Sequence, residues 1–349
     1  MPYIDSVHFN PDKHHARIIC TLGPSSSRKN IIKLMAQSGM KVARLNFSHG
    51  SHPEHQKLIN IVRELNKDHG MDIEILQDLA GYRIRIGILE SPITLKEKDI
   101  LTLSNDPQYK DKHIPLDSDF DISTLKNDMM IYIADGMIAL KVKAVYDNRV
   151  KARVIAGGKL KSRKGVNIPD LRLRSNILTE KDQKDIEFGI KNKVDFIAQS
   201  FVRNQKDIER INELVKPELP DCRIIAKIEN KQGVRNIDKI IDACDGILVA
   251  RGDLGVSLPI YKIPVIQKDI IRRCNNREKI VVTATQMLES MTESPRPTRA
   301  EVSDVANAIF DGTDYVMLSG ETAIGRFPVR SVRMMAHVVD FTEKFLRKG

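Results

Sequence analysis

A lysine and two carboxylates stand directly after two short apolar runs in the middle of this sequence. Lys227 and Glu229 end the first run, and Asp253 follows the second, two residues after Arg251. Carboxylate oxygens are the ligands that hard divalent cations prefer, and a neighbouring lysine suits an anionic substrate. Three unpaired charges at this spot would be costly, so we expect them to bind a metal ion and an anion. A structural ion-pair triad is the alternative.

The predicted secondary structure brings these side chains together. Residues 223–228 and 246–249 are predicted strands, and the residues 232–243 between them are a predicted helix. In such a β-α-β unit the two strands are parallel, and their carboxyl ends meet at one edge of the sheet. Ligands of α/β folds lie at that edge.

Strands and helices alternate along most of the chain. Eight predicted strands are centred near Ile18, Val42, Ile75, Phe196, Ile225, Leu248, Val281 and Val316. Eight parallel strands that each lead into a helix predict an α/β fold of the closed (β/α)₈, or TIM, barrel type. An open, doubly wound sheet is the alternative. Residues 84–164 break the alternation with short β segments, so we expect a small inserted β-barrel lid domain, with 1–83 and 165–349 forming the barrel.

Polar side chains follow nearly every predicted strand. Besides the residues named above, they are Arg44, Asn46, Ser48, His49, Asp78, Arg83, Arg85, Thr285, Ser319 and Glu321. One rim of a TIM barrel is catalytic and the other is stabilising, so this concentration predicts an active site.

Two further groups of polar residues are interpreted as structural or solvated residues rather than as binding sites. His49, His52 and His55 have a spacing that could bind zinc, but Pro53 indicates a helix start, and a solvated first helical turn is favoured. Glu301 and Asp304 are expected to face solvent or to pair with Arg299.

Composition narrows the class of protein. The 349 residues carry a net charge of +10, 41% hydrophobic residues, 5% aromatic residues and no Trp. Without a dominant basic block or stacking aromatics, the positive field favours small phosphorylated anions over nucleic acid. No apolar run reaches the roughly 18–20 residues of a membrane helix, and no signal peptide is evident. The four cysteines lack metal-type spacing, so we expect reduced core thiols and a cytoplasmic protein.

Several motifs resemble those of the pyruvate kinase family, in the same order along the chain. They are CTLGP (20–24), ARLNFSHG (43–50), KGVNIP (164–169), AKIEN (226–230), VARGDLG (249–255), TATQMLESM (283–291), SDVANA (303–308) and MLSGETA (317–323). The resemblance covers nearly the whole chain. It implies a barrel with an inserted β lid, and transfer of a phosphoryl group between phosphoenolpyruvate and ADP, with pyruvate and ATP as products.

The same resemblance implies roles for individual residues. Arg44 would grip the phosphate, and Lys227 would neutralise the phosphoryl group and the developing enolate. Glu229 and Asp253 would bind Mg²⁺ or Mn²⁺. The N–H groups of Gly252 and Asp253 would take the substrate carboxylate.

The remaining implied roles concern proton transfer and the nucleotide. Thr285 would also bind the substrate carboxylate, and Thr285 and Ser319 resemble the family's proton relay. His49, Arg85 and Lys164 would bind the nucleotide.

A potassium site is implied as well. Its ligands would be Asn46, Ser48, Asp78 and the carbonyl of Leu79. Members that need K⁺ carry Glu where this chain has Arg83, and K⁺-independent members carry Lys. The fixed positive charge of Arg83 therefore predicts that K⁺ is dispensable.

Some positions depart from the family pattern, chiefly towards the lid and the nucleotide. They are Tyr82, Ala134, Asp135, Asp170, Ser175–Ile177, Ser257 and Tyr261. A paralogous enzyme with a different phosphoryl acceptor and a non-catalytic phosphoenolpyruvate sensor therefore stay open as alternatives. Family members usually continue with a C-terminal effector domain, which we expect to be absent here. A homodimer through the barrel surface is expected.

Overall fold

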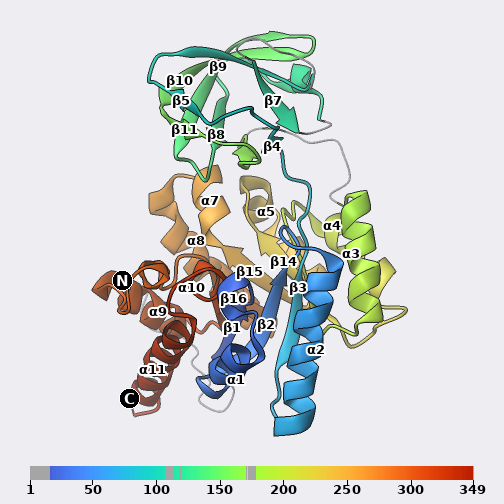
Figure 1. The fold of residues 1–349 in the computed structure, drawn as a ribbon, viewed down its shortest axis with the longest axis vertical. Helices are drawn as coiled ribbons and strands as arrows, with labels where there is room; N and C mark the ends of the chain where they lie inside the picture. The colour runs from blue at the N-terminus through green and yellow to red at the C-terminus, as the bar shows by residue number, and fades with distance from the viewer. Residues whose placement is uncertain (1–15, 107–112, 118–119, 170, 172–177, 349) are drawn as a thin grey trace. The chain divides into compact units, whose positions relative to one another are not determined.

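The computed structural model describes residues 16–106, 113–117, 120–169, 171 and 178–348. Eight parallel strands close into a barrel in the order β1-β17-β16-β15-β14-β13-β3-β2 (Figure 1). Their bounds are β1 Arg17–Thr21, β2 Met40–Asn46, β3 Glu74–Asp78, β13 Phe196–Gln199, β14 Arg223–Ile228, β15 Gly246–Ala250, β16 Ile280–Ala284 and β17 Tyr315–Leu318. These are the eight strands predicted from the sequence. The closed α/β barrel is therefore confirmed, and the open sheet is wrong.

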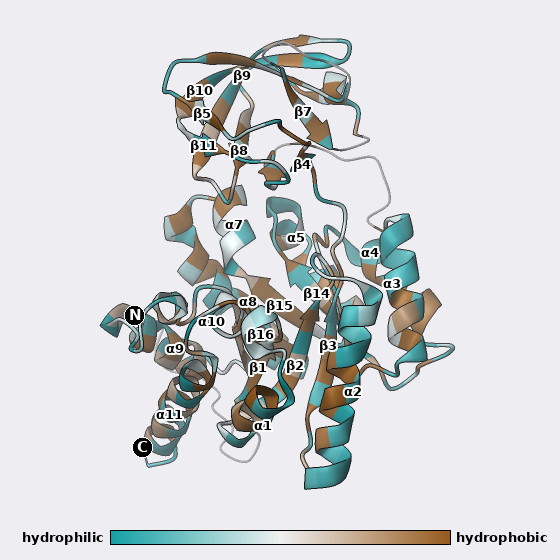
Figure 2. Cartoon of the chain, in the orientation of Figure 1, coloured by the Kyte–Doolittle hydropathy of each residue, from teal (hydrophilic) through white to brown (hydrophobic). Residues whose placement is uncertain are grey.

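The interior of the barrel is filled by apolar side chains. One buried cluster takes members from all eight strands, among them Ile19, Leu76, Phe196, Leu248 and Met317. Strands that are buried on both faces read as nearly unbroken apolar runs, which is why they could be recognised. Figure 2 shows β15 as largely hydrophobic, whereas α2 (His52–His69) is hydrophilic over much of the side that faces the viewer.

Helices follow the strands around the barrel. Besides α2, they are α1 Lys29–Gln37, α3 Glu180–Lys191, α4 Gln205–Val215, α5 Lys231–Arg235, α6 Ile237–Ala243, α7 Arg251–Ser257, α8 Ile263–Asn275, α9 Arg299–Phe310, α10 Gly320–Ala323 and α11 Pro328–Leu346. Short 3₁₀ turns occur at η1 Pro24–Ser26, η2 Ile122–Thr124, η3 Ile260–Lys262 and η4 Glu289–Thr292.

Two helix ends follow capping signals in the sequence. The side chain of Thr179 accepts a hydrogen bond from Asp182 N at the start of α3, and Gly70 takes a left-handed φ of +60° after α2. The single helix predicted for residues 232–243 is wrong. Asn236 leaves helical geometry at φ −101° and ψ +15°, and it separates α5 from α6.

A second compact unit comprises Tyr82–Ile177 together with Gly252–Tyr261. Its larger sheet has the strand order β12-β8-β9-β10-β6-β7-β4, and β11 pairs with β5 in a smaller one (Figure 1). The strands are β4 Arg85–Ile86, β5 Ile93–Leu95, β6 Ile100–Ser104, β7 His113–Asp117, β8 Met130–Ile133, β9 Ile138–Tyr146, β10 Arg149–Ala156, β11 Gly158–Leu160 and β12 Val166–Asn167. The predicted β fold of the insert is confirmed, with a core of its own that includes Ile131, Leu140 and Val150.

The four cysteines Cys20, Cys222, Cys244 and Cys274 are buried and free. Burial raises the pKa of the Cys222 thiol to about 12, which keeps it protonated and inert at neutral pH. This agrees with the expectation of reduced core thiols. No helix in the described residues is both long and apolar enough to cross a membrane.

Candidate active site at the carboxyl ends of the barrel strands

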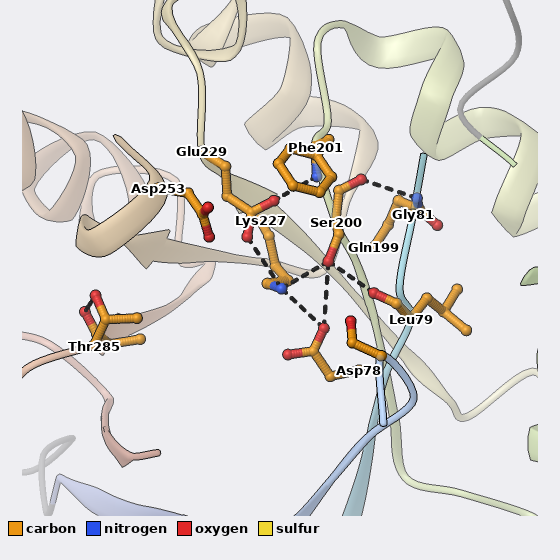
Figure 3. A network of polar contacts seen from close by, with 12 residues as sticks. Asp78, Leu79, Gly81, Gln199, Ser200, Phe201, Lys227, Glu229, Asp253 and Thr285 are labelled. Carbon is orange, nitrogen blue, oxygen red and sulfur yellow. Dashed lines mark hydrogen bonds and ion pairs between the residues drawn. The ribbon is translucent and has the colours of Figure 1, made fainter. Parts of the chain in front are cut away.

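Lys227 lies near the end of β14 and is almost fully buried. Its Nζ lies 2.9 Å from Asp78 Oδ1, 2.7 Å from Ser200 Oγ and 3.1 Å from Glu229 Oε1. Figure 3 shows these contacts converging on the lysine from three strand ends. The expectation that Lys227 and Glu229 are unpaired charges is wrong, because each is the other's partner and Asp78 supplies a second carboxylate.

Arg44 on β2 shares Asp78 with the lysine. Its Nε donates to Asp78 Oδ2 at 2.7 Å, and its Nη1 donates to Thr21 Oγ1 at 2.7 Å. The hydroxyl of Thr21 donates in turn to the carbonyl of Leu318. Arg44 is 7% exposed and Asp78 1% exposed, so two cations are fixed around one carboxylate with little solvent screening.

This arrangement holds Lys227 and Asp78 in their charged forms. Burial alone would lower the pKa of Lys227, but the carboxylates of Asp78 and Glu229 outweigh it and the pKa is raised. Burial alone would raise the pKa of Asp78, but Lys227 and Arg44 outweigh it and the pKa is lowered. At neutral pH the site therefore presents a charged ammonium beside the side chain of Arg44.

Glu229 is also held by the backbone. Its Oε2 accepts a hydrogen bond from Phe201 N at 2.6 Å, and the residue is 2% exposed. Phe201 has a φ of +57°, which is uncommon for a non-glycine residue and turns its N–H towards the carboxylate. The carboxylate is thus fixed in position before any ligand binds.

The residues of the implied potassium site make local hydrogen bonds. Asn46 Oδ1 accepts from Ser48 N at 3.0 Å, which shapes the turn after β2. The carbonyl of Leu79 accepts from Ser200 Oγ at 2.7 Å. Among the described residues, Gln199 Oε1 is buried without a hydrogen-bond partner.

Thr285 and Ser319 end two other strands. Thr285 directly follows β16, has a φ of +69°, and donates its hydroxyl to the carbonyl of Ala284 at 2.6 Å (Figure 3). Ser319 follows β17, and its N–H donates to Glu321 Oε2 at 2.7 Å. Glu321 is fully buried and also accepts from Leu288 N at 3.0 Å, so it ties the two strand ends together.

α2 begins at His52 with Pro53 in its first turn, as predicted, but His55 is buried rather than solvated. His55 is buried, stacks on Phe47 at 4.1 Å between ring centroids, and places Nε2 3.0 Å from the carbonyl of His49. Burial lowers the pKa of His55. His52 Nε2 lies 2.7 Å from Asp185 Oδ1. His55 thus stabilises the loop that carries Asn46, Ser48 and His49.

Glu301 and Asp304 are partly exposed, and the structure gives them partners other than Arg299. Glu301 accepts hydrogen bonds from Ser290 and Thr298, at the start of α9. Asp304 accepts from Arg251 Nη1 at 2.6 Å. These carboxylates thus organise the loop after β16.

The other predicted site residues belong to the second unit and are described within it. Arg83 Nη2 lies 3.1 Å from Asp253 Oδ1 and 3.2 Å from Asp135 Oδ1. Burial, with the nearby charge of Arg83, lowers the pKa of Arg85. Gly252 is the second residue of α7 and precedes Asp253, and Lys164 contributes a carbonyl that accepts from Ile86 N at 2.8 Å.

Comparison with known proteins decides the family. The family model described as "Pyruvate kinase, barrel domain" matches residues 13–332. This chain belongs to the pyruvate kinase family. A protein of Geobacillus stearothermophilus named pyruvate kinase is 46% identical over 339 residues, which cover 96% of this chain and 58% of that protein.

Other members of the pyruvate kinase family give a similar picture. One from Thermococcus litoralis is 45% identical over 95% of this chain and 70% of its own length. One from Staphylococcus aureus is 43% identical over 92% of this chain and 56% of its own length. The chain thus spans little more than half the length of some of the relatives it matches.

Two residues of the site had no predicted role. Ser200 bridges Lys227, the carbonyl of Leu79 and, at 3.5 Å, Asp78. Arg251 binds the loop after β16. Both directly follow a barrel strand, which is the signal that could have marked them.

Proposed function

We propose that this chain transfers a phosphoryl group from phosphoenolpyruvate to ADP, giving pyruvate and ATP, with Mg²⁺ or Mn²⁺. The observation that carries the proposal is the buried pair of cations, Arg44 and Lys227, that share Asp78 beside Glu229. A phosphoryl group in transfer spreads negative charge over its oxygens, and preorganised cations out of water stabilise that charge.

Arg44 is proposed to bind the phosphate. Its Nη1 and Nη2 each contact one partner, Thr21 and Asp78 respectively. Each terminal nitrogen of a guanidinium carries two N–H groups, so a further N–H on each is available for a phosphate oxygen. Asp78 and Thr21 fix the plane of the guanidinium before the substrate arrives.

Lys227 is proposed to stabilise the charge that develops on the bridging oxygen as pyruvate enolate leaves. Its ammonium is held charged by Asp78 and Glu229 rather than by the substrate. No proton therefore has to move for the lysine to act. The backbone N–H groups of Gly252 and Asp253, in the first turn of α7, are proposed to bind the substrate carboxylate together with Thr285.

Protonation of the enolate is assigned to Thr285 and Ser319 acting through water. Thr285 donates its hydroxyl to the carbonyl of Ala284. Rotation about χ1 would release it towards a substrate. The hydroxyl is a relay rather than a final proton source, because its own pKa lies far from neutrality.

Glu229 and Asp253 are proposed to hold Mg²⁺ or Mn²⁺. A fixed, buried carboxylate such as Glu229 fits a hard cation. No group of three or more His, Cys, Asp or Glu in the described part of the chain could hold a metal by itself. Substrate oxygens and water would complete the ligand shell. Bound metal would polarise the phosphoryl and enolate oxygens as a Lewis acid.

The potassium site is proposed at Asn46, Ser48, Asp78 and the Leu79 carbonyl, with Arg83 making K⁺ dispensable. The nucleotide is proposed to contact His49, Arg85 and Lys164. A second copy of the chain is proposed to bind through the barrel surface, and the cytoplasm is the proposed compartment because all four thiols are free.

The test is a coupled assay with phosphoenolpyruvate, Mg²⁺ and a panel of nucleoside diphosphates. Pyruvate and ATP formed from ADP in equal amounts are expected. Turnover only with another acceptor would replace ADP in the proposal. Phosphoenolpyruvate binding without any turnover would favour the sensor and refute the enzyme.

A further inference from the structure

The loop after β16 is held in an unfavourable backbone conformation. Thr285 and Gln286 have φ values of +69° and +54°, both in the left-handed region. Left-handed backbone is rare for residues with a side chain, and for a β-branched residue such as Thr it is a genuine outlier. Such strain persists only where surrounding contacts over-determine it, and it concentrates at functional sites.

The side chain of Arg251 contacts the strained part of this loop directly. Arg251 Nε donates to the carbonyl of Ala284 at 3.1 Å, and its Nη2 donates to the carbonyl of Thr285 at 2.7 Å. Its Nη2 also lies 2.8 Å from Met287 Sδ. The planar guanidinium therefore binds the carbonyl before and the carbonyl after the Cα of Thr285. These two contacts fix the position of the Thr285 side chain.

The guanidinium is itself anchored by two helices. Its Nη1 donates to Asp304 Oδ1 on α9 at 2.6 Å and to Gln267 Oε1 on α8 at 3.3 Å. The Arg251 side chain is 13% exposed, so water does not compete freely for these bonds. The residue therefore connects the end of β15 to the end of β16 through a fixed bridge.

We propose that Arg251 is a positioning residue that holds Thr285 in the conformation needed to bind the substrate and relay its proton. It acts through Thr285 and touches no reacting atom. This inference rests on the proposed function, and it extends that function to a residue with no assigned part in the chemistry.

The first test needs no activity. Hydrogen–deuterium exchange is followed in the peptide that covers residues 283–291, in the wild type, in Arg251→Gln and in Arg273→Gln. Arg273 also joins two helices, through Asp238 at 2.6 Å, but it contacts no strand-end carbonyl of this loop. We expect about tenfold faster exchange in Arg251→Gln only. Equal exchange in all three proteins would overturn the proposal.

The second test is kinetic. Arg251→Gln should lower kcat by 10- to 100-fold with a smaller change in KM, because a misplacement of about 1 Å costs up to about 10²-fold in rate. Exchange of the pyruvate methyl protons with D₂O in the presence of ATP should fall by a similar factor. In a Thr285→Val background, Arg251→Gln should add less than about twofold. Full additivity of the two substitutions would refute action through Thr285.

Milder variants separate positioning from folding. Arg251→Lys keeps the charge but loses the fork, and it should recover part of the activity. Asp304→Asn removes only the anchor, and it should lower kcat by a smaller factor in the same direction. If the wild type is active and Arg251→Gln has the same activity, this inference is refuted and the proposed function stands. If the wild type has no turnover, the proposed function is refuted. The hydrogen–deuterium exchange experiment would still test whether Arg251 holds the loop after β16.

Discussion

Asp78→Asn tests whether the buried cations depend on a shared carboxylate. The two oxygens of Asp78 lie 2.7 Å from Arg44 Nε and 2.9 Å from Lys227 Nζ. The substitution is nearly isosteric, so packing is kept while Arg44 loses a buried counter-ion and Lys227 keeps only Glu229 of its two carboxylates. Removing one partner of a buried ion pair costs about 3–5 kcal/mol. That is a large part of the roughly 5–15 kcal/mol that stabilises a folded domain.

The pH dependence follows from the directions of the two pKa shifts. The pKa of Asp78 is lowered, so its contribution is present above the ordinary aspartate value of about 3.9 and is lost as pH falls through the folded value. The pKa of Lys227 is raised, so its contribution is complete below the ordinary lysine value of about 10.4 and is lost as pH rises through the folded value. Between about pH 5 and 9 the gap between wild type and variant should therefore be constant.

The assay is urea unfolding followed by circular dichroism at several pH values, with Asp238→Asn as control. Asp238 accepts from Arg273 Nη1 at 2.6 Å, but its side chain is about half exposed. Its loss should cost less than about 1 kcal/mol. If Asp78→Asn is no more destabilising than Asp238→Asn, the electrostatic reasoning about the site is refuted.

The remaining predictions concern the second unit and its cations. Arg83→Gln removes the guanidinium 3.1 Å from Asp253, so Mn²⁺ should bind several-fold tighter by calorimetry, and weaker or equal binding would contradict this. Gly165→Ala would place a Cβ 2.5 Å from Arg83 Nε, so it should displace the Arg83 side chain and also tighten Mn²⁺ binding. A fall in Mn²⁺ affinity would count against the proposed effect of the Arg83–Asp253 ion pair. Turnover should continue when K⁺ is replaced by tetramethylammonium, and a strict K⁺ requirement would reject the role given to Arg83.

The barrel was predictable because its strands are buried on both faces. Each of the eight gave a short apolar run, and the helix starts carried capping signals such as Thr179 with Asp182. The break at Asn236 was not predictable, because apolar spacing continues across it on both sides. The association of Gly252–Tyr261 with the second unit is a tertiary contact with no local signal.

The site also has a part that could be predicted from the sequence and a part that could not. Strand ends identified Lys227, Glu229 and Arg44, since residues at or just after the carboxyl end of a barrel strand are placed by the fold. Their partners were not predictable. Asp78 lies 149 residues from Lys227 in sequence, and only closure of the barrel brings the two together. The charges expected to await a ligand were thus already paired, and the site is preorganised.

The most direct measurement of the central claim is phosphoryl transfer from phosphoenolpyruvate to ADP by Lys227→Met beside the wild type and Lys216→Met. Lys216 also pairs with a carboxylate, Asp245 at 3.0 Å, but at the amino end of β15. The wild type and Lys216→Met should form pyruvate and ATP in equal amounts, and Lys227→Met should be slower by about 10²–10³-fold with its fold intact. Retained transfer in Lys227→Met, or no transfer by the wild type, would contradict the account.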